Sequence, residues 1–256
     1  MKHKIFFFLY KILGLILCLI YWDAQYFWWI MVAFLLVYLL IVALGSYFIR
    51  LNWFIKSVNH NNEEGVSFTF DDGPHPKNTT SILNTLKKYN VKATFFVIGK
   101  EAKKYPELIR QIFDEGHIIG NHSYSHSHFI PFFAKKKLIN DYKKTDLILK
   151  NIIGQKPNYI RPPFGATSPK YTKLLNKTNY TSFGWTYRTF DTTSITRESL
   201  INNTLSAIER NNKTILLFHD TKDITVDSLD EILQKLNDNG TKIVNIEKSI
   251  NQLPYE

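Results

Sequence analysis

A short apolar stretch that ends in two acids limits the possible folds of this chain more than any other segment. The β-prone residues 67–70 lead directly into Asp71 and Asp72, and Gly73-Pro74 then turns the chain. This pattern predicts a buried strand whose carboxyl end delivers two carboxylates to one place. Because successive strand residues face opposite ways, the two acids can do different jobs. The alternative is a plain turn in which an aspartate caps its own backbone.

The first 56 residues are apolar and aromatic, whereas the rest of the chain is polar and rich in Lys, Asn and Thr. Residues 5–22 carry one charge, Lys11, and residues 26–49 form a run of 24 without any. A run of that length can cross a bilayer as a helix. We predict a membrane anchor over residues 1–53, with helices at about 5–22 and 26–49, then a polar linker over 54–64 and a folded domain over 65–256. The alternative is a hairpin buried in a soluble protein. A cleaved signal peptide does not fit, because a second apolar run follows at once.

The flanking charges indicate how the two predicted helices are oriented. The turn between them holds only Asp23, and the basic residues lie at the outer ends: Lys2, Lys4, Lys11, Arg50 and Lys56. By the positive-inside rule both ends, and with them the folded domain, are expected in the cytoplasm. If only one segment crosses, the domain lies outside instead. Both arrangements predict an integral protein of the bacterial inner (cell) membrane.

The chain has a net charge of +10 and a single cysteine, Cys18. Basic chains suit nucleic acids or anionic membrane surfaces. No nucleic-acid motif accompanies the scattered lysines, so we expect membrane lipids, and no nucleic acid, as partners. One cysteine excludes an intrachain disulfide and a cysteine-based metal site.

Predicted strands and helices alternate along the folded domain with short links. This alternation indicates an α/β fold with a parallel sheet, either a (β/α) barrel or an open doubly wound sheet. Further strands are expected at 93–98, 118–121, 159–160, 181–185, 214–218 and 242–246, and helices at about 79–90, 106–116, 135–151, 169–177, 197–211 and 226–238. The chemically capable residues fall where strands end, which is where such folds build their sites: Asp71, Asp72, His122, Arg161, Asp191 and His219.

His122 and His126 are four residues apart, and on a helical turn they would share a face and grip one cation. Two histidines and one carboxylate leave a metal with open positions, and Asp72 is the candidate third ligand. Asp71 is then placed to act as a base beside Arg161, which keeps its carboxylate ionised. His219 can act as the acid if Asp191 keeps it protonated. The alternatives are a satisfied core histidine at 219 and a turn residue at 191. We expect His117 and His128 to be structural or solvent-facing.

Four short motifs occur in an order that resembles the NodB-homology polysaccharide deacetylases, carbohydrate esterase family 4. The resemblance covers residues 65–250 and rests on Thr69-Phe70-Asp71-Asp72-Gly73-Pro74, His122-Ser123-Tyr124-Ser125-His126, Arg161-Pro162-Pro163-Phe164-Gly165 and Leu217-Phe218-His219.

The resemblance implies a distorted (β/α) barrel and one divalent metal ion, usually zinc, held by Asp72, His122 and His126. It also implies Asp71 as the base, oriented by Arg161, and His219 as the acid. The backbone N–H of Phe164 is implied as an oxyanion donor, and Leu217 as the wall of the pocket for the acetyl methyl group.

This sequence departs from one further motif of the family. A tryptophan-headed strand is usually followed by D-x-x-D-W, but here Trp185 is followed by Arg188, Asp191 and Thr192. Asp191 keeps the acidic position that tunes the histidine, whereas Arg188 and Thr192 replace the first Asp and the Trp. We expect an altered groove wall near Trp185, in which Arg188 can meet a phosphate or another anionic group.

These observations predict a membrane-tethered, metal-dependent hydrolase that removes N-acetyl groups from sugars. A cytoplasmic domain favours a lipid-linked sugar or another envelope precursor, and an external one favours a cell-wall polymer such as peptidoglycan. The alternative is a catalytically inactive, membrane-tethered glycan-binding module.

Overall fold

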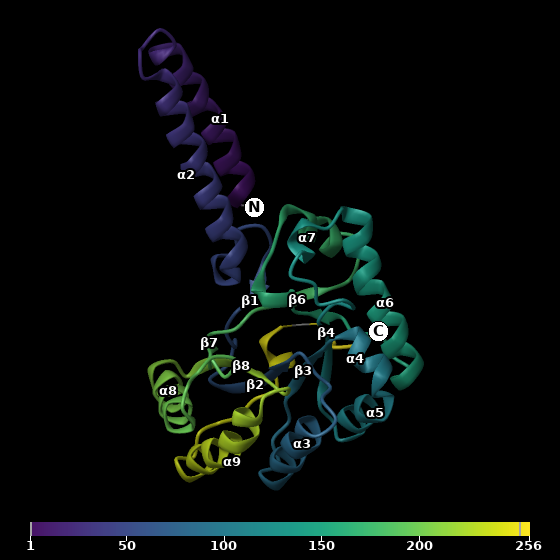
Figure 1. The fold of residues 1–256 in the computed structure, drawn as a ribbon. Helices are drawn as coiled ribbons and strands as arrows, with labels where there is room; N and C mark the ends of the chain where they lie inside the picture. Colours follow the sequence, from purple (N-terminus) through teal and green to yellow (C-terminus); the bar gives the residue numbers. More distant parts are fainter. Residues whose placement is uncertain (1, 251) are drawn as a thin grey trace.

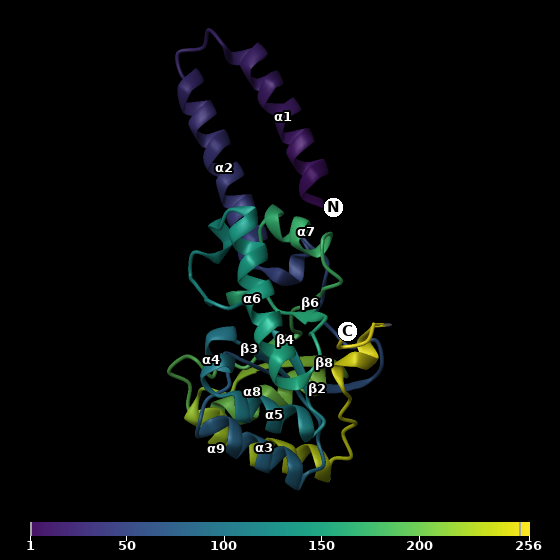
Figure 2. The same ribbon diagram turned by 90° about the vertical axis from the view of Figure 1, so that its right-hand side faces the viewer.

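The chain folds into a long helical hairpin joined to a barrel-like α/β domain (Figure 1). The computed structural model describes residues 2–250 and 252–256. The hairpin consists of α1 (Lys2–Tyr21) and α2 (Phe27–Tyr47), followed by the 3₁₀ turn η1 (Ile49–Leu51). Its first residues lie beside the domain, since Lys2 Nζ donates to the Leu51 carbonyl over 3.1 Å. Both ends of the hairpin are therefore at the barrel, and its tip points away (Figures 1 and 2).

The domain is built on an 8-stranded sheet in the order β1-β6-β5-β4-β3-β2-β8-β7, and every described pairing between its strands is parallel. The strands are β1 (Ser57–Val58), β2 (Gly65–Asp71), β3 (Thr94–Val97), β4 (Ile118–Asn121), β5 (Tyr159–Ile160), β6 (Thr181–Phe183), β7 (Tyr187–Arg188) and β8 (Lys213–His219). The sheet confirms the predicted α/β class and its distorted (β/α) barrel.

The sheet is curled almost into a closed barrel. β6 and β7 lie toward opposite edges of the sheet, yet only residues 184–186 connect them. Because a residue spans at most about 3.6 Å, so short a link keeps these strands close together. The interior of the barrel is thus narrow, and side chains from facing strands can meet across it.

The side chains of β2 alternate between the interior of the barrel and the apolar core between the sheet and the helices. All of β2 is buried, as expected for a strand covered on both faces. Val66, Phe68 and Phe70 join the main apolar cluster with Ile82, Leu83 and Leu86 of α3 (Asn78–Lys88). Because side chains alternate, Thr69 and Asp71 face the other way, into the barrel.

Helices cover the outside of the sheet (Figures 1 and 2). They are α3 (Asn78–Lys88), α4 (Gly99–Lys104), α5 (Pro106–Asp114), α6 (Lys135–Ile153), α7 (Pro169–Leu175), α8 (Arg197–Arg210) and α9 (Asp223–Asp238), with 3₁₀ turns η2 (Ile130–Phe132), η3 (Pro163–Gly165) and η4 (Ile246–Ser249).

Several segments differ from the sequence-based prediction, among them two near the ends of the domain. Residues 242–246 form only an isolated bridge, Val66 to Ile243, before the chain turns into η4. Residues 54–64, predicted as a polar linker, are packed onto the barrel: they contain β1, and Phe54 and Ile55 are buried. Polar side chains there bond to the backbone of the domain; Asn61, for example, donates to the carbonyls of Gly65 and Thr214.

Candidate active site

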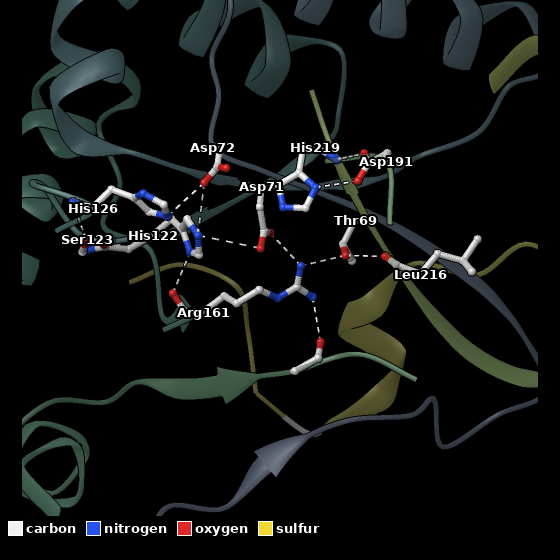
Figure 3. A network of polar contacts seen from close by, with 12 residues as sticks. Thr69, Asp71, Asp72, His122, Ser123, His126, Arg161, Asp191, Leu216 and His219 are labelled. Atoms are coloured by element: carbon white, nitrogen blue, oxygen red, sulfur yellow. Dashed lines mark hydrogen bonds and ion pairs between the residues drawn. The ribbon is translucent and has the colours of Figure 1, made fainter. Parts of the chain in front are cut away.

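The predicted site residues converge at the carboxyl ends of the strands (Figure 3). Asp71 ends β2 and His219 ends β8, and the two residues are paired in the sheet. Asp72 follows with φ of 77°, a left-handed conformation that ends the strand. This turn explains how adjacent acids reach different partners.

Asp72, His122 and His126 form a compact set of potential metal ligands. One ligand atom from each residue lies within 4.8 Å of the other two. Asp72 Oδ1 is 3.0 Å from His126 Nε2 and 3.5 Å from His122 Nε2. This carboxylate oxygen is buried and receives no well-formed hydrogen bond. Three lone-pair donors directed at one point, one of them an unsatisfied anion, fit a divalent cation such as zinc.

The two histidines do not share a helical turn, contrary to the expectation from their spacing. Residues 122–126 form an irregular loop in which Ser123 and His126 have φ of 69° and 46°. Asp141 Oδ2 accepts from the backbone N–H groups of residues 124 and 125, and Ser123 Oγ accepts from that of His126. The loop geometry therefore depends on α6, which carries Asp141.

A second contact orients His122. Its Nδ1–H donates to the Arg161 carbonyl over 2.7 Å, so in the neutral ring Nε2 is the nitrogen that carries the lone pair, and it faces Asp72. Burial of Asp72 by itself raises the pKa of this carboxyl, but the two imidazoles outweigh burial and lower that pKa below its usual range. Burial lowers the pKa of His126, which favours the neutral ring that a metal requires.

Asp71 is held by a buried arginine. Arg161 Nη1 donates to Asp71 Oδ1 over 2.7 Å and to Thr69 Oγ1 over 2.8 Å, and Nη2 donates to the Gly184 carbonyl over 2.7 Å. Arg161 and Asp71 are both almost completely removed from solvent. The other oxygen of Asp71 lies 3.7 Å from His122 Nε2, beside the ligand set. The carboxylate of Asp71 is thus held in one orientation beside the ligand set.

His219 and Asp191 form a second charged pair on the opposite side of Asp71. His219 Nδ1–H donates to Asp191 Oδ1 over 2.8 Å, while the other Asp191 oxygen accepts from the His219 backbone N–H and from Thr225 Oγ1. Burial by itself lowers the pKa of His219, but the bond to Asp191 and the nearby carboxylates outweigh it and raise that pKa. The imidazole is therefore suited to donate a proton.

The site opens into a pocket of about 390 Å³. Phe164, Leu217 and Trp185, expected there from the sequence, all line it, and so does Arg188. Phe164 and Gly165 have φ of 60° and 68°. Gly165 lies against Trp185, so a Cβ added to Gly165 would be only 2.5 Å from the indole ring. The backbone of 164–165 thus forms one wall of the pocket with the indole against it.

Sequence reasoning missed several residues of the site. Tyr47, the last residue of α2, lines the pocket. His128, expected to be structural or solvent-facing, also lines it, and its ring stacks on Phe164 with centroids 4.7 Å apart. His117 is structural as expected: it is buried, accepts from the Ala93 N–H, and burial lowers its pKa to about 4. No local signal indicates Tyr47, because its role arises from tertiary packing.

Comparison with known proteins identifies the family. Residues 59–183 match the model for polysaccharide deacetylase. A peptidoglycan-N-acetylglucosamine deacetylase of Bacillus cereus is 36% identical over 192 residues, which are 72% of this chain and 68% of that protein. The chain belongs to the polysaccharide deacetylases of carbohydrate esterase family 4. The peptidoglycan-N-acetylmuramic acid deacetylase PdaC of Bacillus subtilis is 32% identical over 185 residues, 72% of this chain and 38% of PdaC.

Solved structures of the family share the fold. The peptidoglycan N-acetylglucosamine deacetylase Bc1960 superposes with a TM-score of 0.72 at 32% identity, over 77% of this chain and 94% of that chain. BA3943 of Bacillus anthracis, described as a family pseudoenzyme, superposes with a TM-score of 0.66 at 26% identity, over 74% and 66%. Because the family includes a pseudoenzyme, the residues of the site distinguish an active protein from an inactive one.

Proposed function

We propose that this polysaccharide deacetylase is a membrane-anchored, metal-dependent enzyme that removes N-acetyl groups from a glycan of the cell envelope. The observation that carries the proposal is the grouping of three units in one pocket. These are the ligand set of Asp72, His122 and His126, the base Asp71 with Arg161, and the acid His219 with Asp191. A glycan-binding module without activity has no need for a separate base and acid.

Asp72, His122 and His126 would hold the cation, with zinc the best match to one carboxylate and two imidazoles, and it would supply Lewis-acid polarisation and make a water more acidic. Asp71 takes a proton from the attacking water, whose oxygen bonds to the amide carbonyl carbon. The Phe164 N–H lies in the pocket wall and donates to the oxyanion. The carbon–nitrogen bond then breaks, His219 protonates the nitrogen, and acetate and a free amine leave. One water is consumed for each acetyl group removed.

We place the hairpin in a membrane because of its surface. Both helices are long and apolar enough to cross a bilayer, and the most apolar windows of α1 and α2 are only 6% and 0% buried. A helix in the core of a soluble protein would be mostly buried, whereas here the apolar side chains face outward. Two spans put the N-terminal end and the barrel on the same side, which the flanking lysines and arginines assign to the cytoplasm. A reporter that works only outside the cell can be fused to the C-terminus. Activity of this reporter would contradict the assignment to the cytoplasm.

Replacing Asp71 by Asn tests the catalytic proposal. The change keeps the shape of the side chain and removes the base, so turnover is expected to fall by about 10²–10⁴-fold while zinc stays bound. Release of acetate from an N-acetylated chitooligosaccharide measures turnover, and elemental analysis measures zinc. Asp238→Asn, at an exposed position at the end of α9, is the matched control. Undiminished turnover in Asp71→Asn would remove Asp71 from the mechanism, and an inactive wild-type protein would favour the binding module.

A further inference from the structure

The membrane hairpin forms part of the active-site wall. Ser46 and Thr167 exchange two hydrogen bonds, from Thr167 N–H to the Ser46 carbonyl over 2.9 Å and from Ser46 Oγ to the Thr167 carbonyl over 2.5 Å. Ile49 is buried against the backbone of Gly165 and Gly184. These contacts fix the end of α2 on the barrel mouth, so that Tyr47 lines the catalytic pocket.

A second pocket continues from the first toward the hairpin. It has a volume of about 300 Å³ and shares Tyr47, Phe164, Trp185 and Arg188 with the catalytic pocket. Its remaining lining is mainly apolar and comes from η1 with the residue before it and from the β7 segment: Phe48, Ile49, Arg50, Thr186, Tyr187 and Phe190. The side chains at its rim are exposed, with Tyr47 at 60%, Phe48 at 49% and Phe190 at 48%. An apolar groove with exposed aromatics at the end of a membrane helix is suited to the interfacial region of a bilayer.

Two cations border this groove. The Arg188 guanidinium contacts the Thr192 hydroxyl and lies 5.6 Å from the Phe190 ring, and its buried Nε–H has no acceptor. Among the described residues, neither Arg188 nor Arg50 has an ion pair with a carboxylate. An arginine with free donors at the edge of an apolar groove is suited to a phosphate group.

We propose that the substrate is a lipid-linked sugar, an N-acetylated saccharide joined through phosphate to a long apolar chain. This inference rests on the proposed function and specifies its substrate class. The acetamido sugar occupies the catalytic pocket, the phosphate lies against Arg188 with Arg50 nearby, and the apolar chain runs along the aromatic groove into the bilayer. The sugar, the phosphate and the apolar chain of such a molecule would thus lie in that order along the path from the ligand set, through the two pockets, to the end of α2.

The test uses the full-length, zinc-loaded protein in phosphatidylcholine vesicles and three substrates with the same sugar. The first is N-acetylglucosamine joined by diphosphate to a polyprenyl chain, the second has the sugar on an uncharged alkyl chain, and the third is a soluble N-acetylglucosamine tetramer. Acetate release gives kcat and KM for each. The wild-type protein is expected to prefer the first substrate over the other two by at least about tenfold in kcat/KM.

Variants separate phosphate recognition from other effects. Arg188→Gln should raise KM for the diphosphate substrate by about tenfold, with little change in kcat and a much smaller effect on the uncharged chain. Arg188→Lys should restore part of the loss, and Arg110→Gln, an exposed arginine on α5, is the matched control. A tetramer hydrolysed as well as the lipid-linked sugar, or an equal effect of Arg188→Gln on charged and uncharged substrates, overturns the inference and leaves the deacetylase proposal intact. If none of the three substrates is hydrolysed, the deacetylase proposal itself fails, and this inference fails with it.

Discussion

Replacing Arg161 by Met probes the contact on which the geometry of the base depends. The substitution keeps much of the length of the side chain but removes the donors to Asp71, Thr69 and Gly184. The carboxylate of Asp71 would then be left in the barrel interior without its cation. Removing one partner of a buried ion pair costs about 3–5 kcal/mol, mostly because the remaining charge is unpaired. For a chain of this size that corresponds to a fall in Tm of about 6–20 °C.

Thermal unfolding of the detergent-solubilised full chain, followed by near-UV circular dichroism in the presence of a chelator, measures this loss. The chelator matters because a bound cation would offset part of the unpaired charge. The double variant Asp71→Asn/Arg161→Met removes both charges, so it should be more stable than the sum of the two single changes predicts, by about 0.5–3 kcal/mol. If the two changes add within about 0.5 kcal/mol, the residues are not energetically coupled, and the assignment of Arg161 as the group that holds the base is wrong.

Three further changes test other parts of the site. His126→Ala should lose bound zinc by elemental analysis, whereas His128→Ala, which changes a pocket residue outside the ligand set, should retain it; equal zinc in both would contradict the ligand assignment. Asp191 raises the pKa of His219, so Asp191→Asn should lower that pKa and move the alkaline limb of the activity profile to lower pH; an unchanged limb would show that another group is the acid. Burial raises the pKa of Asp220 to about 7, so the folded state binds the extra proton and stability should fall as pH rises from about 4 through 7. Asp220→Asn should flatten the dependence of Tm on pH in that range, and a persistent slope would assign the effect to other groups.

The sequence predicts the chemical groups of the site well because each lies beside a buried strand. Asp71 and His219 end the apolar strands β2 and β8, whose patterns are evident in the sequence, and parallel strands bring their carboxyl ends to one edge. Arg161 follows β5, a strand of only two residues, and the motif around it indicates its place better than the short strand does. Position along the chain was thus enough to group these side chains, although not to give their distances.

The parts that could not be predicted depend on contacts between distant segments. The spacing of His122 and His126 suggests a helical turn, but the loop is held by Asp141 on α6, and two of its residues are left-handed. Residues 54–64 look like a linker because they are polar, yet their polar groups bond to the backbone of neighbouring strands. Tyr47 carries no local signal for a pocket residue, since only the packing of α2 against the barrel places it there.

The charges of the site explain why a divalent cation suits it. The carboxylate of Asp71 is paired with Arg161, and that of Asp191 is bonded to His219 and raises the pKa of its ring. Asp72 faces imidazole nitrogens, and burial keeps one of these rings, His126, toward its neutral form. Asp72, by contrast, forms no ion pair with an arginine or a lysine among the described residues. A divalent cation there would add positive charge in a pocket where an amide develops negative charge as water adds to it. Asp72 is thus the residue at which a bound cation would both pair with a buried carboxylate oxygen and stabilise the negative charge that develops in the reaction.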